Sequence, residues 1–299
     1  MKRFTALLAA LMLALCCCGC SADAAQPRVM ISFYPIYILA MNVFDGVDVT
    51  LDCMTAPETG CLHDYQLLAG DMMKLADADM LIVCGAGMEA FLPDVTRQFP
   101  DLPVIDCSQG IDLIPEEEHH HDEHGEEEAG FNAHTWLDVQ NAEQIVRTIA
   151  ENASDLLPDL SAKLQENAEN CILRLQALDG RLKTMLEPVK GEKIVTFHEA
   201  FPYFAKAYGI EIAAIINEEH EDTLSPAQLS EVIEIVKAEG NPPLFTEPQY
   251  SDAAAYAIAA ETGAKIYALD PLASGELSPD AYETGMLANA EALLNAFEK

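Results

Sequence analysis

Three histidines lie where predicted strands and helices meet loops, and they carry the clearest chemistry in the sequence. His63, His134 and His198 are far apart along the chain, yet each lies at or beside such a junction. Ligand sites in open α/β sheets form where these loops converge. Three imidazoles with one carboxylate are a nitrogen and oxygen set suited to zinc. The alternative is that each is an ordinary structural histidine, because spacing alone does not bring distant residues together.

Residues 116–128 form a second histidine-rich feature, with the sequence EEEHHHDEHGEEE. The segment offers no apolar side chain for packing, so we expect a surface loop. Its imidazoles and carboxylates could chelate divalent cations loosely, and its negative charge would attract them. The alternative is a solvated run of charge. The auxiliary metal ligands predicted here are His119, His120, His121 and His124, whereas His220 is expected in a polar surface loop.

Two other interpretations compete with a simple metal-binding site. Residues 85–90 read GAGMEA after a predicted strand and match a dinucleotide fingerprint, with Asp106 ending the next strand. Pro93 is expected to break the following helix. The N-terminal segment, which is typical of a signal peptide, predicts export to a compartment without a supply of NAD, so this interpretation is set aside. A zinc hydrolase using Glu199 or Glu247 as its base is the other alternative.

Short apolar strands alternate with helices in both halves of the chain, as is typical of parallel α/β sheets. A long helix over 162–186, apolar at three- and four-residue spacing, separates the halves. We therefore predict an α/β lobe at 28–158, a rigid linking helix at 159–188 and a second α/β lobe at 189–299. The predicted strands are 29–33, 47–54, 80–84, 104–106, 194–196, 210–216, 244–246 and 265–269. The other predicted helices are 34–44, 64–78, 139–150, 200–208, 225–238, 251–262 and 281–297.

The composition limits the partners. The 299 residues include 50 acidic and 16 basic side chains, which gives a formal charge of −34. This length suggests two domains. Such a charge argues against nucleic acid, whose phosphates need cationic contacts, and against an anionic membrane surface. It suits a soluble protein whose copies repel one another, or a protein whose ligand is a cation.

The N-terminus predicts export. Lys2 and Arg3 precede an apolar run, so residues 1–19 are typical of a signal peptide and short for a membrane span. An anchor helix is the alternative. Cys20 follows a small residue and resembles the lipidated cysteine of bacterial lipoproteins, although Cys17 occupies the position where these usually have Leu. We expect residues 20–27 to form a lipid anchor and linker, which places the body outside the cytoplasm.

Five cysteines remain in the exported body, where disulfides are permitted. Cys53 and Cys61 flank a turn and could form a local bridge, and Cys84 and Cys107 end consecutive strands and could form another. Cys171 lies on the long helix. The alternative is five buried thiols.

Taken together, five short motifs resemble the metal-receptor lipoproteins of bacterial ABC transporters that import zinc or manganese. They occur in this order along nearly the whole mature chain: HDY at 63–65, HTWLD at 134–138, FHEAF at 197–201, FTEPQ at 245–249 and ALDPL at 268–272. The chain departs from the family just before the first histidine. The family often has Pro or Glu there, whereas this chain has Leu62 after Cys61, so it lacks an auxiliary carboxylate.

The resemblance implies a fold, a ligand and partners. Metal would bind in the cleft between the lobes, through His63, His134, His198 and Asp270. Histidine at the third position is typical of zinc-type members, and Glu199 and Glu247 would be supporting groups. Zn²⁺ would be captured without catalysis and passed to an ABC permease and its ATPase by a monomeric receptor. Binding should weaken as the pH falls through the imidazole pKa, about 6.5. A manganese or iron receptor of the same fold is the main alternative. An adhesin role could coexist with the receptor function.

Overall fold

The computed structural model describes residues 26–63, 65–116, 130–216, 225–249 and 251–298. The predicted signal peptide, Cys20 and the four histidines of the acidic segment lie outside these residues, as does His220. Among the helices that are described, none combines the length and the apolar character needed to cross a membrane.

The first sheet has four parallel strands in the order β2-β1-β3-β4. Its two central strands, β1 and β3, are the most apolar, and every residue of β3 is buried, as expected of strands covered on both faces. The strands are β1 (Arg28–Ile31), β2 (Thr50–Cys53), β3 (Met80–Val83) and β4 (Val104–Asp106). The helices of this part are α2 (Tyr34–Val43), α3 (Ala69–Ala76) and α4 (Leu92–Gln98).

The second sheet repeats the arrangement, with parallel strands in the order β6-β5-β7-β8. Ser225 caps α8 by accepting a hydrogen bond from the backbone N–H of Gln228, and Pro226 occupies the first turn. The strands are β5 (Lys193–Thr196), β6 (Glu211–Ile215), β7 (Leu244–Thr246) and β8 (Ile266–Ala268). The helices are α7 (Pro202–Tyr208), α8 (Pro226–Ala238) and α9 (Ala253–Thr262).

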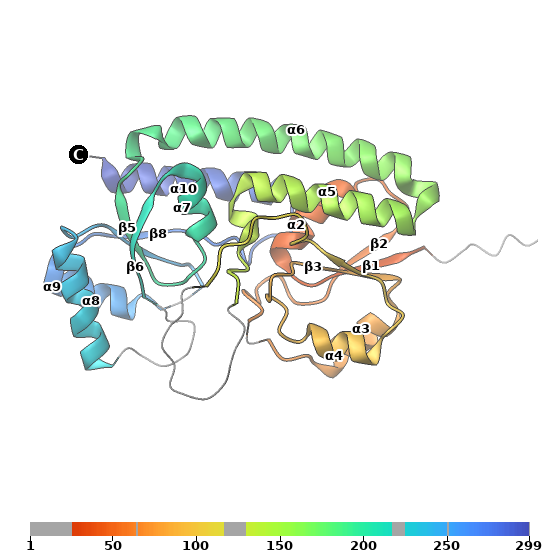
Figure 1. Ribbon diagram of the computed structural model, residues 1–299, viewed down its shortest axis with the longest axis horizontal. Coiled ribbons are helices and arrows are strands. Elements are labelled where there is room, and N and C mark those ends of the chain that lie inside the picture. The colour runs from red at the N-terminus through yellow and green to blue at the C-terminus, as the bar shows by residue number, and fades with distance from the viewer. Residues whose placement is uncertain (1–25, 64, 117–129, 217–224, 250, 299) are drawn as a thin grey trace, which may run out of the picture.

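Three long helices pack on the two sheets, and one of them extends over both (Figure 1). They are α5 (Val139–Leu156), α6 (Ser161–Leu186) and α10 (Ala281–Phe297), while the short 3₁₀ turns η1 (Thr135–Leu137), η2 (Pro158–Leu160) and η3 (Glu187–Val189) flank the first two. Helix α6 runs from one lobe to the other, as predicted, and α5 packs beside it. The two parallel-sheet lobes and their long connecting helix are therefore confirmed.

The lobes are tied together by more than this one helix. The C-terminal helix α10 packs on α6 and on α2 of the first lobe. The indole N–H of Trp136 donates to the backbone oxygen of Pro271 at 2.7 Å, and the Tyr282 hydroxyl donates to the backbone oxygen of Trp136 at 2.7 Å. Trp136 and Tyr282 belong to a buried core that includes residues of both lobes. These ties favour limited motion between the lobes.

Two local predictions were wrong. Helix α3 begins at Ala69 rather than near residue 64, because Asp71 accepts hydrogen bonds from the Leu68 N–H and the Tyr65 hydroxyl, which fixes the preceding residues as a loop. Pro93 does not break a helix. It lies in the first turn of α4, where its missing N–H costs no hydrogen bond.

Neither of the two possible disulfides is present among the described cysteines. Cys53 and Cys61 are not bridged, and neither are Cys84 and Cys107. Cys84 instead donates its thiol hydrogen to the backbone oxygen of Ala133 at 3.4 Å. The structure therefore agrees with the alternative of five thiols rather than disulfides. Only Cys84, Cys107 and Cys171 are buried, however.

Candidate metal centre

The motif residues come together because they follow the carboxyl ends of parallel strands. His63 lies in the loop after β2, and His134 ends the long connection from β4 to η1. In the second lobe His198 lies just beyond β5, and Asp270 just beyond β8. This edge is where open α/β sheets bind ligands.

Three imidazole rings form a continuous group. The rings of His134 and His198 contact edge to face, with centroids 4.7 Å apart. The ring of His63 also lies against His134, with its centroid 5.3 Å from that of His134. The fold therefore brings the rings of all three predicted histidines together. Of the three, only His134 and His198 belong to the described group whose ligand atoms lie within 4.8 Å of one another.

His134 has a defined tautomer. Its Nδ1 lies 3.3 Å from the side-chain oxygen of Asn132, which also accepts the His134 backbone N–H at 3.0 Å. An amide oxygen only accepts, so Nδ1 carries the proton and Nε2 carries a lone pair. Tyr203 fixes the segment further, because its hydroxyl donates to the backbone oxygen of Asn132.

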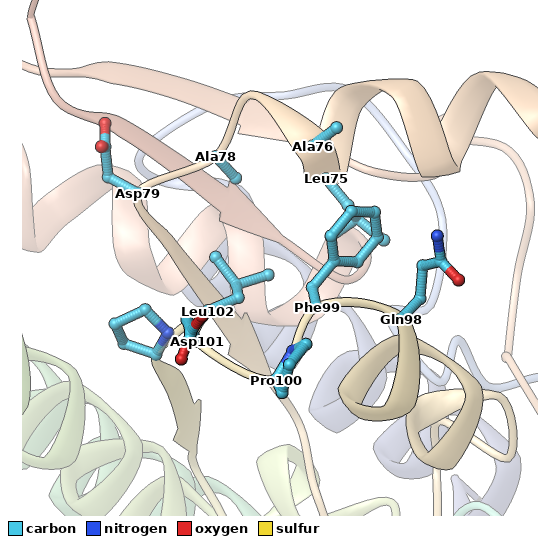
Figure 2. Close-up of a pocket in the computed structure, with 10 residues that line it drawn as sticks. Leu75, Ala76, Ala78, Asp79, Gln98, Phe99, Pro100, Asp101 and Leu102 are labelled. Carbon is cyan, nitrogen blue, oxygen red and sulfur yellow. The ribbon is translucent and has the colours of Figure 1, made fainter.

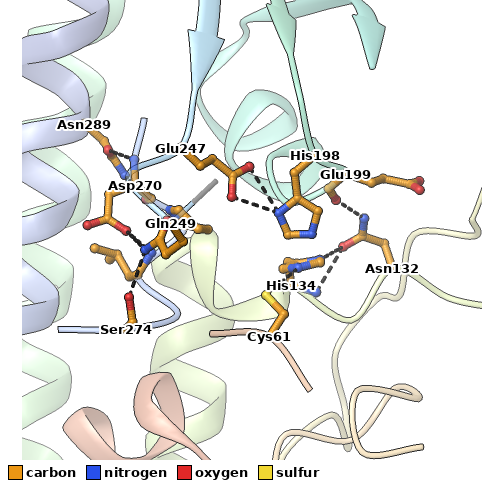
Figure 3. Close-up of polar contacts among 12 residues, drawn as sticks. Cys61, Asn132, His134, His198, Glu199, Glu247, Gln249, Asp270, Ser274 and Asn289 are labelled. Atoms are coloured by element: carbon orange, nitrogen blue, oxygen red, sulfur yellow. Dashed lines mark hydrogen bonds and ion pairs between the residues drawn. The ribbon is translucent and has the colours of Figure 1, made fainter. Parts of the chain in front are cut away.

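His198 is oriented in the same way by a carboxylate. Both oxygens of Glu247 lie within 3.1 Å of its Nδ1, and both side chains are almost fully buried (Figure 3). Nδ1–H donates to the carboxylate, which leaves Nε2 as the available ligand atom. This is the supporting contact expected of Glu247. Glu199 differs, because its backbone oxygen accepts from Asn132 while its side chain points away from the imidazoles.

Asp270 is held by its own network. Its Oδ1 accepts the Leu272 N–H at 2.8 Å and a Gln249 amide hydrogen at 3.2 Å. Asn289 pairs with the backbone of Asp270 through two further hydrogen bonds. These contacts give the carboxylate a fixed position beside Gln249 and Ser274 (Figure 3).

One residue of the cluster was not predicted as a ligand. Among the described residues, Cys61, His134 and His198 are the group whose ligand atoms lie within 4.8 Å of one another, a spacing that could hold a metal ion. Cys61 was considered for a disulfide instead. The signal that could have identified it is its position two residues before His63, since soft metal sites often combine closely spaced Cys and His.

Electrostatics favour neutral ligands. Burial lowers the pKa of His134 well below its usual 6.5, and the neighbouring His198 and His63 rings lower it further. A neutral imidazole is the form that binds metal. The arrangement can therefore bind a divalent cation through nitrogen at neutral pH.

The glycine-rich segment after β3 has a structural role. Glu89 is buried, and its carboxylate accepts the backbone N–H groups of Cys84 at 2.7 Å and Gly85 at 3.0 Å. The chain's own carboxylate thus occupies donors that a phosphate would require. Gly85 has φ +82°, and a Cβ there would lie 1.8 Å from the Asp106 carboxylate. These glycines therefore serve backbone geometry, which agrees with setting the nucleotide site aside.

A pocket of about 440 Å³ lies elsewhere, between the ends of α3 and α4 (Figure 2). Its lining residues precede β3 and β4, and they include Asp79, Phe99 and Asp101. This is the amino end of the sheet, opposite to the edge that carries the imidazoles. The pocket is not part of the metal centre.

Comparison with known proteins agrees with this geometry. A profile of the family described as "Zinc-uptake complex component A periplasmic" matches residues 29–296. The chain belongs to this family.

Curated relatives of the family bind zinc or manganese, according to their names. The chain is 32% identical over 287 residues to the zinc-binding lipoprotein AdcA of Streptococcus pneumoniae, covering 92% of this chain and 56% of AdcA. It is 29% identical to the high-affinity zinc uptake system protein ZnuA of Yersinia pestis, covering 86% of this chain and 87% of ZnuA. The manganese-binding lipoprotein MntA of Halalkalibacterium halodurans is 29% identical over 73% of this chain and 68% of its own length. The chain thus spans only about half the length of AdcA.

Solved structures of the family share the fold. A crystal structure of ZnuA superposes with a TM-score of 0.78 at 25% identity, covering 91% of this chain and 100% of that one. A Zn(II)-bound mutant variant of AdcAII from Streptococcus pneumoniae gives a TM-score of 0.74 at 26% identity, covering 90% of this chain and 98% of that one.

Proposed function

We propose that this protein is an extracytoplasmic receptor that captures Zn²⁺ and delivers it to an ABC permease for import. The observation that carries the proposal is the shared orientation of two imidazoles. In both His134 and His198, Nδ1 donates to a protein acceptor, so Nε2 is the atom left for a metal. Such partners fix the tautomer and raise the basicity of metal-binding histidines.

The proposed ligands are His63, His134, His198 and Asp270. Nitrogen donors favour zinc over manganese, which prefers oxygen. The names of the AdcA and ZnuA relatives support zinc as well. Each proposed ligand follows a different strand of the two sheets, so capture of the ion would draw on both lobes.

The proposed setting follows from the N-terminus and the family. Residues 1–19 would be removed and Cys20 lipidated, which anchors a monomeric receptor to the outer face of a membrane. Zinc would then pass to a permease driven by a separate ATPase. Residues 116–128 would collect cations nearby through His119, His120, His121 and His124.

Transport rather than catalysis is proposed because the available donors can fill the coordination shell. A catalytic zinc keeps one position open for water or substrate, whereas four protein ligands close a tetrahedral site. Glu247, the candidate base of a zinc hydrolase, is engaged with His198. Glu199, the other candidate, points away from the imidazoles.

Zinc titration by calorimetry tests the proposal. We expect His63→Ala and His198→Ala to lose tight binding. Deletion of residues 116–128 should remove only additional weak sites, and His220→Ala is a control expected to bind like the wild type. Tight binding that survives both alanine substitutions would contradict the proposed site.

A manganese receptor is the second candidate, supported by the MntA relative. Competition between the two metals on the purified protein separates the candidates. Zinc should displace manganese at comparable concentrations, and displacement in the opposite direction would contradict the zinc assignment.

A further inference from the structure

Cys61 places a sulfur atom beside the nitrogen that faces the proposed metal position. Its Sγ lies 3.4 Å from Nε2 of His134. Because Nδ1 of His134 carries the proton that faces Asn132, the Cys61 thiol donates to the lone pair of Nε2. Figure 3 shows the Cys61 side chain directed at the His134 ring.

The distances fit one tetrahedral ion. Zinc binds sulfur at about 2.3 Å and imidazole nitrogen at about 2.0–2.1 Å, so S and N ligands of one tetrahedral zinc lie about 3.6 Å apart. The observed separation of 3.4 Å between Sγ of Cys61 and Nε2 of His134 is close to this value. The three ligand atoms of Cys61, His134 and His198 also lie within 4.8 Å of one another.

Asp270 is placed differently. Its Oδ1 is engaged by the Leu272 N–H and the Gln249 amide. Among the described residues, the group of converging ligand atoms consists of Cys61, His134 and His198, and it includes neither Asp270 nor His63. The thiol is thus nearer than the carboxylate to the imidazoles that face the metal position.

We propose that Cys61 binds the transported zinc as a thiolate, together with His134 and His198. The inference rests on the proposed function and changes one ligand of the same site, since Cys61 would take the fourth tetrahedral position in place of Asp270. On binding, the zinc–sulfur bond replaces the S–H bond and the proton passes to solvent, with no change of oxidation state. A thiolate favours zinc over manganese more strongly than a carboxylate does, so Cys61 would also set the selectivity of the receptor.

Cobalt(II) substitution tests the proposal, because a cobalt–thiolate bond gives a charge-transfer absorption in the near ultraviolet that imidazole and carboxylate ligands lack. The full chain would be titrated with one equivalent of Co²⁺ as wild type, as Cys61→Ser and as Cys53→Ser. Cys53 is a matched control, since it is half-buried like Cys61 but lies outside the metal group. The readout is the difference between spectra, because the body of the protein has further thiols outside the metal group.

We expect the band in the wild type and in Cys53→Ser, and a weaker or absent band in Cys61→Ser. Cys61→Ser should still bind metal through its histidines, with a lower ratio of zinc to manganese affinity. Identical spectra for the wild type and Cys61→Ser, in proteins that bind Co²⁺ tightly, would overturn the thiolate ligand and leave the zinc receptor standing. If the wild type bound neither Co²⁺ nor Zn²⁺, the proposed function itself would be overturned.

Discussion

Glu247 and His198 form a buried pair across two neighbouring strands. Strands β5 and β7 are paired, and the two residues follow their carboxyl ends. Both oxygens of Glu247 lie within 3.1 Å of Nδ1 of His198, and each side chain is 1% exposed. The pair fixes the direction of the imidazole before any metal arrives. It therefore reduces the ordering that zinc binding requires.

The first prediction concerns this pair. Glu247→Gln should weaken zinc binding about 10- to 100-fold, the usual effect of removing an outer partner of a metal-binding histidine. Glutamine still offers an oxygen to Nδ1–H but no charge. Calorimetric titration measures the change, and the exposed Glu261→Gln is the control. An unchanged affinity in Glu247→Gln would show that the carboxylate does not support the site.

Much of the fold follows from the sequence. Strands such as β4 and β7 have the predicted bounds because short apolar runs between turn residues leave few alternatives. The start of α3 was misplaced because the side chain of Asp71, rather than the apolar pattern, decides it.

Only part of the site was predicted, again because individual side-chain contacts leave no pattern in the sequence. His63, His134 and His198 were selected from their motifs, and the fold brings their rings together. The direction of a single side chain depends on the loop that carries it, so the placement of Cys61 beside His134 was not predicted. Gln249 and Asn289 also hold Asp270 in place. Their distances from Asp270 along the chain follow no pattern that would predict these hydrogen bonds.

The second prediction uses the only tryptophan of the sequence as a reporter. The ring of Trp136 lies 5.2 Å from that of His134, and its N–H donates to the backbone oxygen of Pro271, the residue after Asp270. Zinc bound at the proposed ligands would change the electric field at the indole. We expect the intrinsic fluorescence to respond to zinc with a 1:1 endpoint in the wild type and to lose this endpoint in His198→Ala. A wild-type spectrum that is indifferent to zinc would count against the site.

The third prediction is that His134 stays neutral in mildly acidic solution. Burial lowers its pKa well below 6.5, and so do the two neighbouring rings. At pH 6 an ordinary exposed histidine is mostly protonated, whereas His134 should not be. Titration of the ring nitrogens by ¹⁵N NMR on the metal-free protein measures this, with His134→Asn used for assignment. Protonation of this ring near pH 6.5 would contradict the prediction, and retained neutrality would let this ligand bind zinc at lower pH than the sequence suggested.

The fourth prediction concerns Glu89, which burial shifts to a pKa of about 7 from 4.5 despite hydrogen bonds from the Cys84 and Gly85 N–H groups. Between these values the folded state holds a proton that the unfolded state has lost. Protonated Glu89 therefore makes its full contribution to the free energy of unfolding below pH 4.5. This contribution is lost as the pH rises through 7, and the loss amounts to about 3 kcal/mol. Glu89→Gln does not titrate, so its free energy of unfolding should change less between pH 5 and pH 8 than that of the wild type. Urea unfolding at both pH values measures the difference, with Glu261→Gln as the control. Equal pH dependence in the wild type and Glu89→Gln would mean that the buried carboxyl ionises as it does in the unfolded chain.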